Sequence, residues 1–311
     1  MCFKHLILCC LAVLLFPACK YSAEDNNIRV GYLQNDLHHL PLFVALEKGF
    51  FEESGLKIEV TGIFKAGPEE MSAFAAGELD LGYVGQAPAT AAYLNRVADI
   101  KFISQSNLEG SSIVVRHGSD IKLAADLSGR TIAIPGHATM QDFLLRKFLK
   151  KSGVSFEDTK IIVLKPPEMI PALKQKSIDA FIAWQPYPSQ AEADGICRVL
   201  VPSADIWENH PCCVVVAGEQ FLKNNPDELL KIKEVHKRAC VFIKKNHEAA
   251  VKIGIKYTGM DAAIVERAVS MIKYDSIIDT DKAVQFVDFL NKLRYIRPDK
   301  NQRSIQNVFN N

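Results

Sequence analysis

The sequence predicts an α/β protein with two lobes, in which the second lobe is inserted into the first through two hinge strands. Short apolar runs typical of strands alternate with longer segments of helical periodicity, and this series occurs twice along the chain. Two extended apolar stretches, 111–116 and 212–217, flank the second series and would carry the chain between the lobes. A simple tandem of two domains is the alternative.

The first series covers residues 28–106 and begins the first lobe. We expect strands at 28–33, 57–61, 79–84 and 100–106, and helices at 41–53, 68–76 and 88–95. The first helix is bounded by Pro41 in its first turn and by Gly55 just past its end. Strands joined by helices of this length imply right-handed parallel crossovers.

The second series and a helical tail complete the chain. We expect strands at 111–116, 131–134, 160–164, 178–183 and 198–201 with helices at 139–152, 168–175 and near 189, then helices at 226–245, 248–257, 261–272 and 281–293. The tail carries apolar residues at spacings of three and four, which suits packing on lobe 1. We therefore assign lobe 1 to 28–112 and 217–311 and lobe 2 to 113–216, with a cleft that closes on a ligand.

Residues 1–18 have the features of an export signal. They contain one basic residue, no acidic residue and an apolar run at 6–16. At about 1.5 Å per residue this run is too short to anchor a helix across a bilayer. The residues Phe-Pro-Ala-Cys at 16–19 resemble a lipobox, so we expect acylation of Cys19 and a linker at 19–27. An ordinary secretory signal with an incidental cysteine is the alternative.

The charge balance excludes a nucleic-acid partner bound through excess positive charge. The chain of 311 residues contains 37 Lys and Arg against 36 Asp and Glu, and loss of Lys4 with the signal leaves 36 of each. Hydrophobic residues make up 48% of the chain, which excludes a mostly disordered protein.

Four cysteines remain in the folded part: Cys197, Cys212, Cys213 and Cys240. A disulfide of Cys197 with Cys213, or with Cys212, is permitted in an exported protein if the two strands that they bracket are neighbours. Buried unpaired thiols are the alternative. A metal site is not expected, because Cys212 and Cys213 are adjacent and no second pair follows.

Candidate ligand contacts lie at four junctions between a strand and a helix. Ligands bind beyond the carboxyl ends of parallel strands, where helix N-termini present unpaired amides. None of the junctions contains Lys or Arg, so we expect a small solute held by backbone dipoles, neutral donors and the ring of Trp184. Turn formation and core packing are the alternative for any one junction. The predicted ligand-binding residues are Asn35, Asp36, His38, His39, Gly85, Gln86, Gly136, His137, Ala138, Thr139, Gln141, Trp184 and Gln185.

No catalytic signature accompanies these junctions. The sequence lacks GxSxG, HExxH, GxGxxG and P-loop motifs, and no nucleophile stands beside a base. His38 and His39 could ligate a metal, but only Asp36 is near enough in sequence to help. We therefore expect no reaction, no metal and no cofactor.

Four segments carry a family pattern: ALEKGFFEESGL at 45–56, AGELDLG at 76–82, DLSGRTIA at 126–133 and IDAF at 178–181. They resemble the substrate-binding proteins of ABC importers, most closely the group for nitrate, sulfonates, taurine and bicarbonate, which includes binders of thiamine-precursor pyrimidines. The resemblance covers nearly all of the chain after residue 28. It implies a two-lobed periplasmic-binding-protein fold of type II.

The resemblance also implies a function. A monomeric lipoprotein, held by Cys19 at the extracytoplasmic or periplasmic face of the membrane, would capture a small solute and deliver it to a permease driven by a separate ATPase. Sulfonate and taurine binders often use a basic side chain, for which this sequence has no clear counterpart. An enzyme on the same scaffold is the alternative, because menaquinone-pathway enzymes and pyrimidine synthases are similar to these binders.

Overall fold

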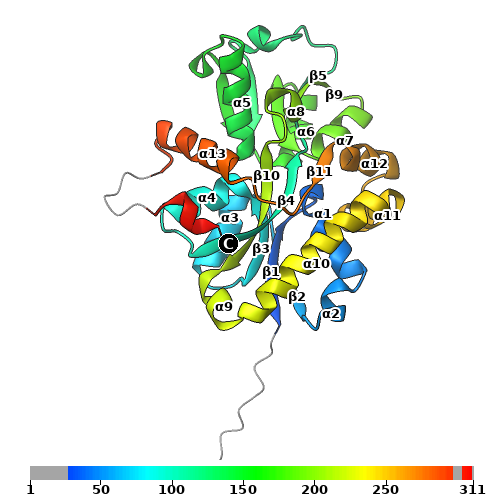
Figure 1. The fold of residues 1–311 in the computed structure, drawn as a ribbon. Helices are drawn as coiled ribbons and strands as arrows, with labels where there is room; N and C mark the ends of the chain where they lie inside the picture. The colour runs from blue at the N-terminus through cyan, green and yellow to red at the C-terminus, as the bar shows by residue number, and fades with distance from the viewer. Residues whose placement is uncertain (1–26, 297–302, 310–311) are drawn as a thin grey trace, which may run out of the picture.

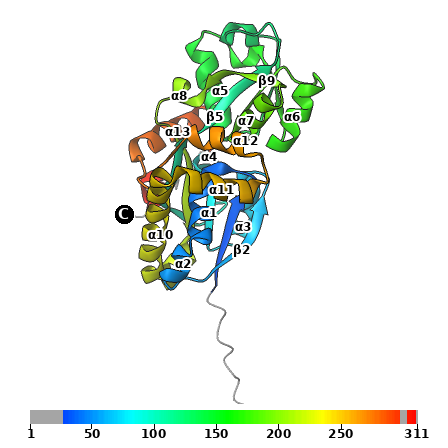
Figure 2. The same cartoon turned by 90° about the vertical axis from the view of Figure 1, so that its right-hand side faces the viewer.

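The computed structural model describes residues 27–296 and 303–309, which fold into two lobes (Figure 1). The predicted signal peptide at 1–18 and the predicted acylation of Cys19 lie outside the described residues, as does almost all of the predicted linker at 19–27. No helix in the described ranges is long and apolar enough to cross a membrane. Each lobe is built on its own β-sheet with helices packed against it (Figure 2).

Six strands form the sheet of lobe 1. They are β1 (Ile28–Leu33), β2 (Ile58–Phe64), β3 (Leu81–Gly85), β4 (Ile100–Glu109), β10 (Pro211–Gly218) and β11 (Ile272–Tyr274). Their order is β11-β4-β10-β3-β1-β2. β1 is parallel to β2 and β3, whereas β10 is antiparallel to β3 and β4, and β11 is antiparallel to β4. The four strands of the first series therefore run in one direction, and the strand that returns from lobe 2 runs against them.

Helices cover both faces of this sheet. They are η1 (Leu37–His39), α1 (Leu40–Glu47), α2 (Phe50–Glu53), α3 (Gly67–Ala75), α4 (Gln86–Leu94), α9 (Glu219–Asn224), α10 (Pro226–Lys245) and α11 (His247–Thr258). Successive residues of β10 face opposite sides: Val214 packs in one core with residues of α3 and α4, and Val215 packs in another with residues of α1, α10 and α11. Burial on both faces explains why β10 is an unbroken apolar run.

Lobe 2 is built on five strands. They are β5 (Ser111–Arg116), β6 (Thr131–Ile134), β7 (Lys160–Val163), β8 (Ala180–Trp184) and β9 (Cys197–Pro202), in the order β7-β6-β8-β5-β9. β6 is parallel to β7 and β8, and β5 is antiparallel to β8 and β9. The helices of this lobe are η2 (Ala124–Leu127), α5 (Met140–Lys151), η3 (Phe156–Asp158), α6 (Pro166–Lys174), α7 (Tyr187–Ala193) and α8 (Ser203–Ile206).

The chain crosses between the lobes twice. β4 ends at Glu109 and β5 begins at Ser111, so the outward crossing is Gly110 alone, whose φ of 83° lies in the left-handed region. The return crossing leads from α8 into β10, which belongs entirely to the sheet of lobe 1. If each strand is assigned to the lobe whose sheet it joins, the boundaries between the lobes fall at residue 110 and just before residue 211. The apolar runs of the sequence predict these boundaries at 112 and 216.

The C-terminal helices contact both lobes rather than lobe 1 alone. α12 (Ala262–Ser270) packs against α11 of lobe 1 and α7 of lobe 2. α13 (Thr280–Lys292) places the ring of Phe289 against that of Phe143 in α5, with the ring centroids 4.5 Å apart. η4 (Ile305–Val308) packs against β4 and α4. The C-terminal region thus also joins the two lobes on the side of α5 and α13 (Figure 1).

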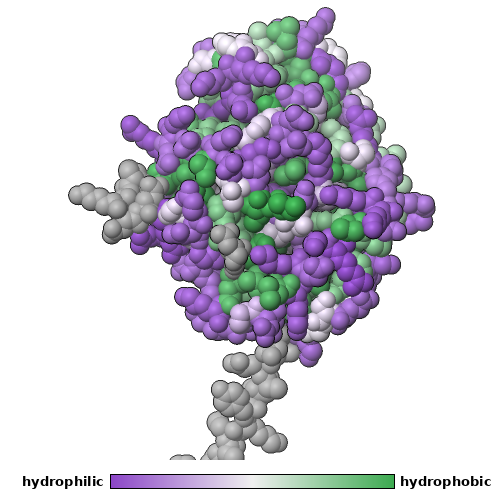
Figure 3. All heavy atoms as spheres, viewed as in Figure 1, coloured by the Kyte–Doolittle hydropathy of each residue, from purple (hydrophilic) through white to green (hydrophobic). Residues whose placement is uncertain are grey.

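Several elements differ from the sequence-based expectation, among them the short helices α8 and α9, which were not predicted. The first predicted helix is divided into α1 and α2, because Gly49 adopts a φ of 67° between them. β11 was not expected, since a strand of three residues is too short to show an alternating pattern. Most of the surface in Figure 3 is polar, with apolar side chains in separate patches.

Candidate ligand-binding cleft

A cavity lies between the lobes, beyond the carboxyl ends of β1, β3, β6 and β8. Its volume is about 20 Å³, which is room for about one water molecule. Lobe 1 and its returning strand supply Leu33, Asp36, His38, Ala66, Gly67, Gly85, Pro88, Cys212 and Cys213, and lobe 2 supplies Pro135, Thr139, Met140, Gln141 and Trp184. Because the wall comes from both lobes, a change in the angle between them opens or closes this cavity.

Three helices begin at the cavity wall. α3 follows Ala66 and α4 follows Gly85, and neither helix has a side-chain cap. α5 is capped by Thr139, whose Oγ1 accepts a hydrogen bond from the N–H of Asp142 at 3.2 Å. Uncapped N-termini bring unpaired N–H donors and the positive ends of helix dipoles to the cavity. The wall can therefore stabilise negative charge without a basic side chain.

The structure brings part of the predicted ligand set to this wall. The predicted residues that line the cavity are Asp36, His38, Gly85, Thr139, Gln141 and Trp184. Those that do not line it are Asn35, His39, Gln86, Gly136, His137, Ala138 and Gln185. The side chain of His137 is 55% exposed and contacts Tyr295, so it lies at the outer surface.

Several buried polar atoms near the cavity have no hydrogen-bond partner in the described part of the chain. They are Nε2 of His39, both amide atoms of the Gln86 side chain and Nε1 of Trp184. Gln185 is engaged instead, because its Oε1 accepts a hydrogen bond from the N–H of Ser189 and its Nε2 donates to Sδ of Met271. Buried unpaired polar atoms are uncommon. Of these residues only Trp184 lines the cavity, so its Nε1 is the unpaired donor that a ligand there could reach.

Cys212 and Cys213 line the cavity, although they are not among the predicted ligand-binding residues. They stand at the start of β10, where the chain returns to lobe 1. The available signal was their position at the second crossing, since residues at a crossing between lobes lie beside the cleft. Their adjacency in sequence argued against a metal site, yet in the structure both sulfur atoms lie near the same histidine.

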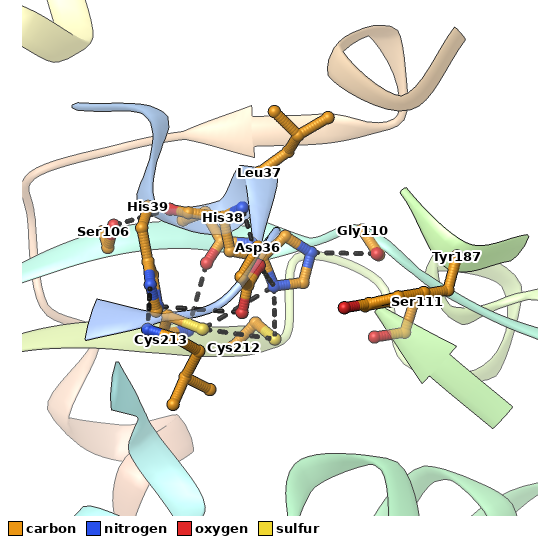
Figure 4. A network of polar contacts seen from close by, with 12 residues as sticks. Asp36, Leu37, His38, His39, Ser106, Gly110, Ser111, Tyr187, Cys212 and Cys213 are labelled. Atoms are coloured by element: carbon orange, nitrogen blue, oxygen red, sulfur yellow. Dashed lines mark hydrogen bonds and ion pairs between the residues drawn. The ribbon is translucent and has the colours of Figure 1, made fainter. Parts of the chain in front are cut away.

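A buried polar cluster surrounds His38 (Figure 4). Nδ1 of His38 lies 3.4 Å from Sγ of Cys212 and 3.6 Å from Sγ of Cys213, and the two sulfur atoms are 4.0 Å apart. Nε2 of His38 lies 2.9 Å from the carbonyl oxygen of Gly110 on the opposite side of the ring. Asp36 caps η1 by accepting a hydrogen bond from the N–H of His38 at 2.9 Å. All of these side chains are buried.

The charges in this cluster depend on one another. The hydrogen bond from the Cys213 thiol, together with the charge of His38, holds the pKa of Cys212 well below its ordinary value. Burial would lower the pKa of His38, but the Cys212 thiolate and the Asp36 carboxylate outweigh burial and raise that pKa to about 9. Burial raises the pKa of Asp36 to about 7 against the opposing effect of His38. The contact between Cys212 and His38 therefore favours transfer of the thiol proton toward the imidazole.

The predicted disulfide is wrong, because all four described cysteines are free. Cys197 begins β9 in the sheet of lobe 2, where it pairs with Arg116. Cys213 lies in β10 in the sheet of lobe 1, opposite Gly85. The two strands follow each other in sequence but belong to different sheets, so their cysteines are not neighbours.

Comparison with known proteins identifies relatives across most of the chain. The family model described as the NMT1-like family matches residues 21–255. A protein of Bacillus subtilis (strain 168) named for binding aliphatic sulfonates is 30% identical over 279 residues, which cover 85% of this chain and 81% of that protein.

Solved structures share the fold. The periplasmic aliphatic sulphonate binding protein SsuA from Escherichia coli has a TM-score of 0.76 at 22% identity, and the match covers 88% of this chain and 94% of SsuA. The enzyme DszB, in a mutant complexed with biphenyl-2-sulfinic acid, has a TM-score of 0.70 at 14% identity, covering 91% of this chain and 96% of DszB. At these identities the likeness establishes the two-lobed periplasmic-binding-protein fold of type II.

Proposed function

Because this chain belongs to the NMT1-like family, and with it to the ABC substrate-binding proteins of the sulfonate, taurine and nitrate group, we propose that it is the solute-binding component of an ABC import system. It would capture a small solute of the sulfonate, taurine or nitrate type and release it to a membrane permease. The observation that carries the proposal is the cavity between the lobes, at whose wall three helices begin.

Capture follows from closure of the two lobes. A solute that touches both lobes binds the closed form more tightly than the open form, and it shifts the equilibrium by that difference in affinity. Gly110 makes the outward crossing a single residue, so rotation there changes the cavity directly. The permease would recognise the closed form and release the solute when the lobes separate again.

The wall offers neutral contacts from both lobes. Gln141 of lobe 2 already donates from Nε2 to Oγ of Ser111 at 3.0 Å, and the unpaired Nε1 of Trp184 is a further donor. The first turns of α3 and α4 supply N–H groups from lobe 1. No Lys or Arg lines the cavity in the described structure, so an anionic head group would be bound by helix dipoles and neutral donors of the protein.

We place the protein outside the cytoplasm. The SsuA of Escherichia coli is periplasmic, and the apolar run at 6–16 has the length of a signal-peptide core. Acylation of Cys19 would then keep the mature protein at the membrane, close to its permease.

The cleft assignment is tested by two tryptophan variants. The chain has two tryptophans, of which Trp184 lines the cavity, whereas Trp207 packs against Phe143 away from it. Titration calorimetry with taurine, ethanesulfonate and nitrate identifies the solute that the wild type binds. We expect Trp184→Ala to weaken binding about tenfold through loss of the aromatic face and Trp207→Ala to bind as the wild type does. Equal affinities for wild type and Trp184→Ala would contradict this placement of the solute.

A second candidate function is catalysis by the Cys212 thiolate. The observation that favours it is the 3.4 Å separation between Sγ of Cys212 and Nδ1 of His38, which is an arrangement used by thiol nucleophiles. Mass spectrometry of the bound solute after prolonged incubation separates the two functions. A binding protein returns the solute unchanged, whereas an enzyme converts it in the wild type and not in Cys212→Ser.

A further inference from the structure

We propose that His38, Cys212 and Cys213 bind a thiophilic metal ion, with Zn²⁺ as the reference ion, and that an anionic solute of the cleft ligates this ion at an open fourth position. The inference deepens the proposed function and rests on it for the identity of the solute class. It supplies a positive charge at a wall that contains no Lys or Arg.

The spacing of the three ligand atoms fits a tetrahedral ion. Zinc binds sulfur at about 2.3 Å and imidazole nitrogen at about 2.0 Å, so tetrahedral angles place two sulfur ligands about 3.8 Å apart and each sulfur about 3.6 Å from the nitrogen. The two sulfur atoms here are 4.0 Å apart, and they lie 3.4 and 3.6 Å from Nδ1 of His38. Each distance is therefore close to its expected value without rearrangement of the cluster.

The histidine is oriented as a ligand. Nε2 of His38 donates to the carbonyl oxygen of Gly110 at 2.9 Å, which leaves Nδ1 directed at the two sulfur atoms (Figure 4). Proteins commonly fix a metal-binding imidazole through such a hydrogen bond from its other nitrogen. A metal ion would take the place of the direct contact between Nδ1 and Sγ of Cys212.

A second set of donors surrounds the first. Oδ1 of Asp36 lies 3.6 Å from Nδ1 of His38, and the ligand atoms of Asp36, His39 and Cys213 lie within 4.8 Å of one another. His39 is fully buried, and its Nε2 has no hydrogen-bond partner in the described structure. Nδ1 of His39 accepts a hydrogen bond from the N–H of Leu33, so the neutral ring carries its proton on Nε2, 3.7 Å from Oδ2 of Asp36. The Asp36 carboxyl group is therefore the further oxygen donor behind the three ligands.

The donor set selects the kind of ion and leaves a position free. Two thiolates and an imidazole favour Zn²⁺ and Cu⁺ over Mg²⁺ and Ca²⁺, which prefer oxygen ligands. Sites with two cysteines and one histidine keep the fourth position of zinc for water or substrate. Here the cavity adjoins all three ligands and is bounded on its far side by Gln141 and Trp184 of lobe 2. The N-termini of α3 and α4 would stabilise the thiolates.

The first experiment measures metal binding. The purified protein is reduced, stripped with a chelator and titrated with Zn²⁺ by calorimetry and with Co²⁺ by absorption spectroscopy. We expect one ion per chain and, with cobalt, a thiolate charge-transfer band together with the strong visible bands of a tetrahedral site. X-ray absorption of the zinc complex should fit two sulfur neighbours, and this readout needs no variant. Absence of the charge-transfer band, or a zinc ion with no sulfur neighbour, would overturn the proposal.

Matched cysteine variants locate the ion. Cys212→Ser, Cys213→Ser and His38→Gln should each weaken zinc binding about a hundredfold, at the upper end of what loss of a supporting residue costs. Cys240→Ser and Cys197→Ser make the same atomic change at buried cysteines outside the cleft and should bind zinc as the wild type does. Circular dichroism confirms that each variant is folded. Wild-type affinity in all three cleft variants would place the ion elsewhere and refute the assignment.

Titration of taurine, ethanesulfonate and nitrate into stripped and zinc-loaded protein separates this inference from the proposed function. Binding that requires zinc supports both. Binding that is equally tight without zinc refutes the role of the ion and leaves the proposed function standing. Zinc binding without any anion binding in either form supports the metal site and refutes ligation of an anionic solute, and with it the proposed solute class.

Discussion

Replacing Gly110 with alanine tests how closely the outward crossing packs against His38. Residue 110 has a φ of 83°, where alanine costs about 1–2 kcal/mol relative to glycine. A Cβ there would also overlap Nε2 of His38 and lie 2.8 Å from Cγ1 of Ile272. The ring of His38 is fully buried and cannot move aside freely. Overpacking of this kind costs a further 1–3 kcal/mol or so, which gives a total loss of about 2–5 kcal/mol.

Gly118→Ala is the matched control for this substitution. Gly118 has a similar φ of 72°, but no atom lies within 4 Å of the position of an added Cβ. The Gly118→Ala variant should therefore lose only about 1–2 kcal/mol of unfolding free energy, which is the conformational cost alone. The assay is urea denaturation of both variants and the wild type at one pH, analysed for the free energy of unfolding. Equal losses in the two variants would refute the close packing of His38 on residue 110.

Three further predictions concern buried groups and the N-terminus. Burial lowers the pKa of His236 to about 4, so the folded state binds fewer protons than the unfolded state below pH 6.5; stability present at pH 7 should fall by about 2 kcal/mol by pH 5. Urea denaturation should show a smaller fall in His236→Gln, and an identical fall would contradict this cause. Burial holds the pKa of Glu70 well above its ordinary value, so as pH rises above the ordinary pKa the unfolded state loses its proton first and wild-type stability falls. Thermal unfolding at pH 8 should therefore show Glu70→Gln to be the more stable protein. Cys19→Ala should move the exported protein from the membrane fraction to the soluble fraction, whereas unchanged fractionation would refute lipid anchoring.

Local signals in the sequence were sufficient for the alternation of strands and helices. Apolar runs followed by helical periods identify β1, β3 and the helices after them, because each pattern depends on residues that are adjacent in the chain. The same signals place Gly85 and Thr139 at junctions between a strand and a helix, and in the structure they are the N-cap residues of α4 and α5 and line the cavity. They could not show β11, whose three residues are held by pairing with β4 rather than by a pattern of their own.

The chemistry of the cluster could not be predicted in the same way. His38 and Cys212 are 174 positions apart, and their contact depends on the register of β10 against β4, which aligns Pro211 with Leu108. The expected disulfide was wrong for a related reason, since strands adjacent in sequence lie in different sheets when the chain changes lobes between them. Where the chain crosses between lobes, residues far apart in sequence come into contact, and local sequence patterns cannot predict these contacts.

The most direct test of solute capture in the cleft measures the fluorescence emission of Trp184 itself. Trp207→Phe leaves Trp184 as the sole tryptophan, and Trp184→Phe leaves only Trp207. Fluorescence is titrated with taurine, ethanesulfonate and nitrate in the presence of Zn²⁺ and a thiol reductant. If the solute binds against Trp184, the protein that retains Trp184 should show a saturable change in emission and the protein that retains Trp207 little change. No saturable change from Trp184 with any of these solutes, or an equal change from Trp207, would contradict this placement of the solute.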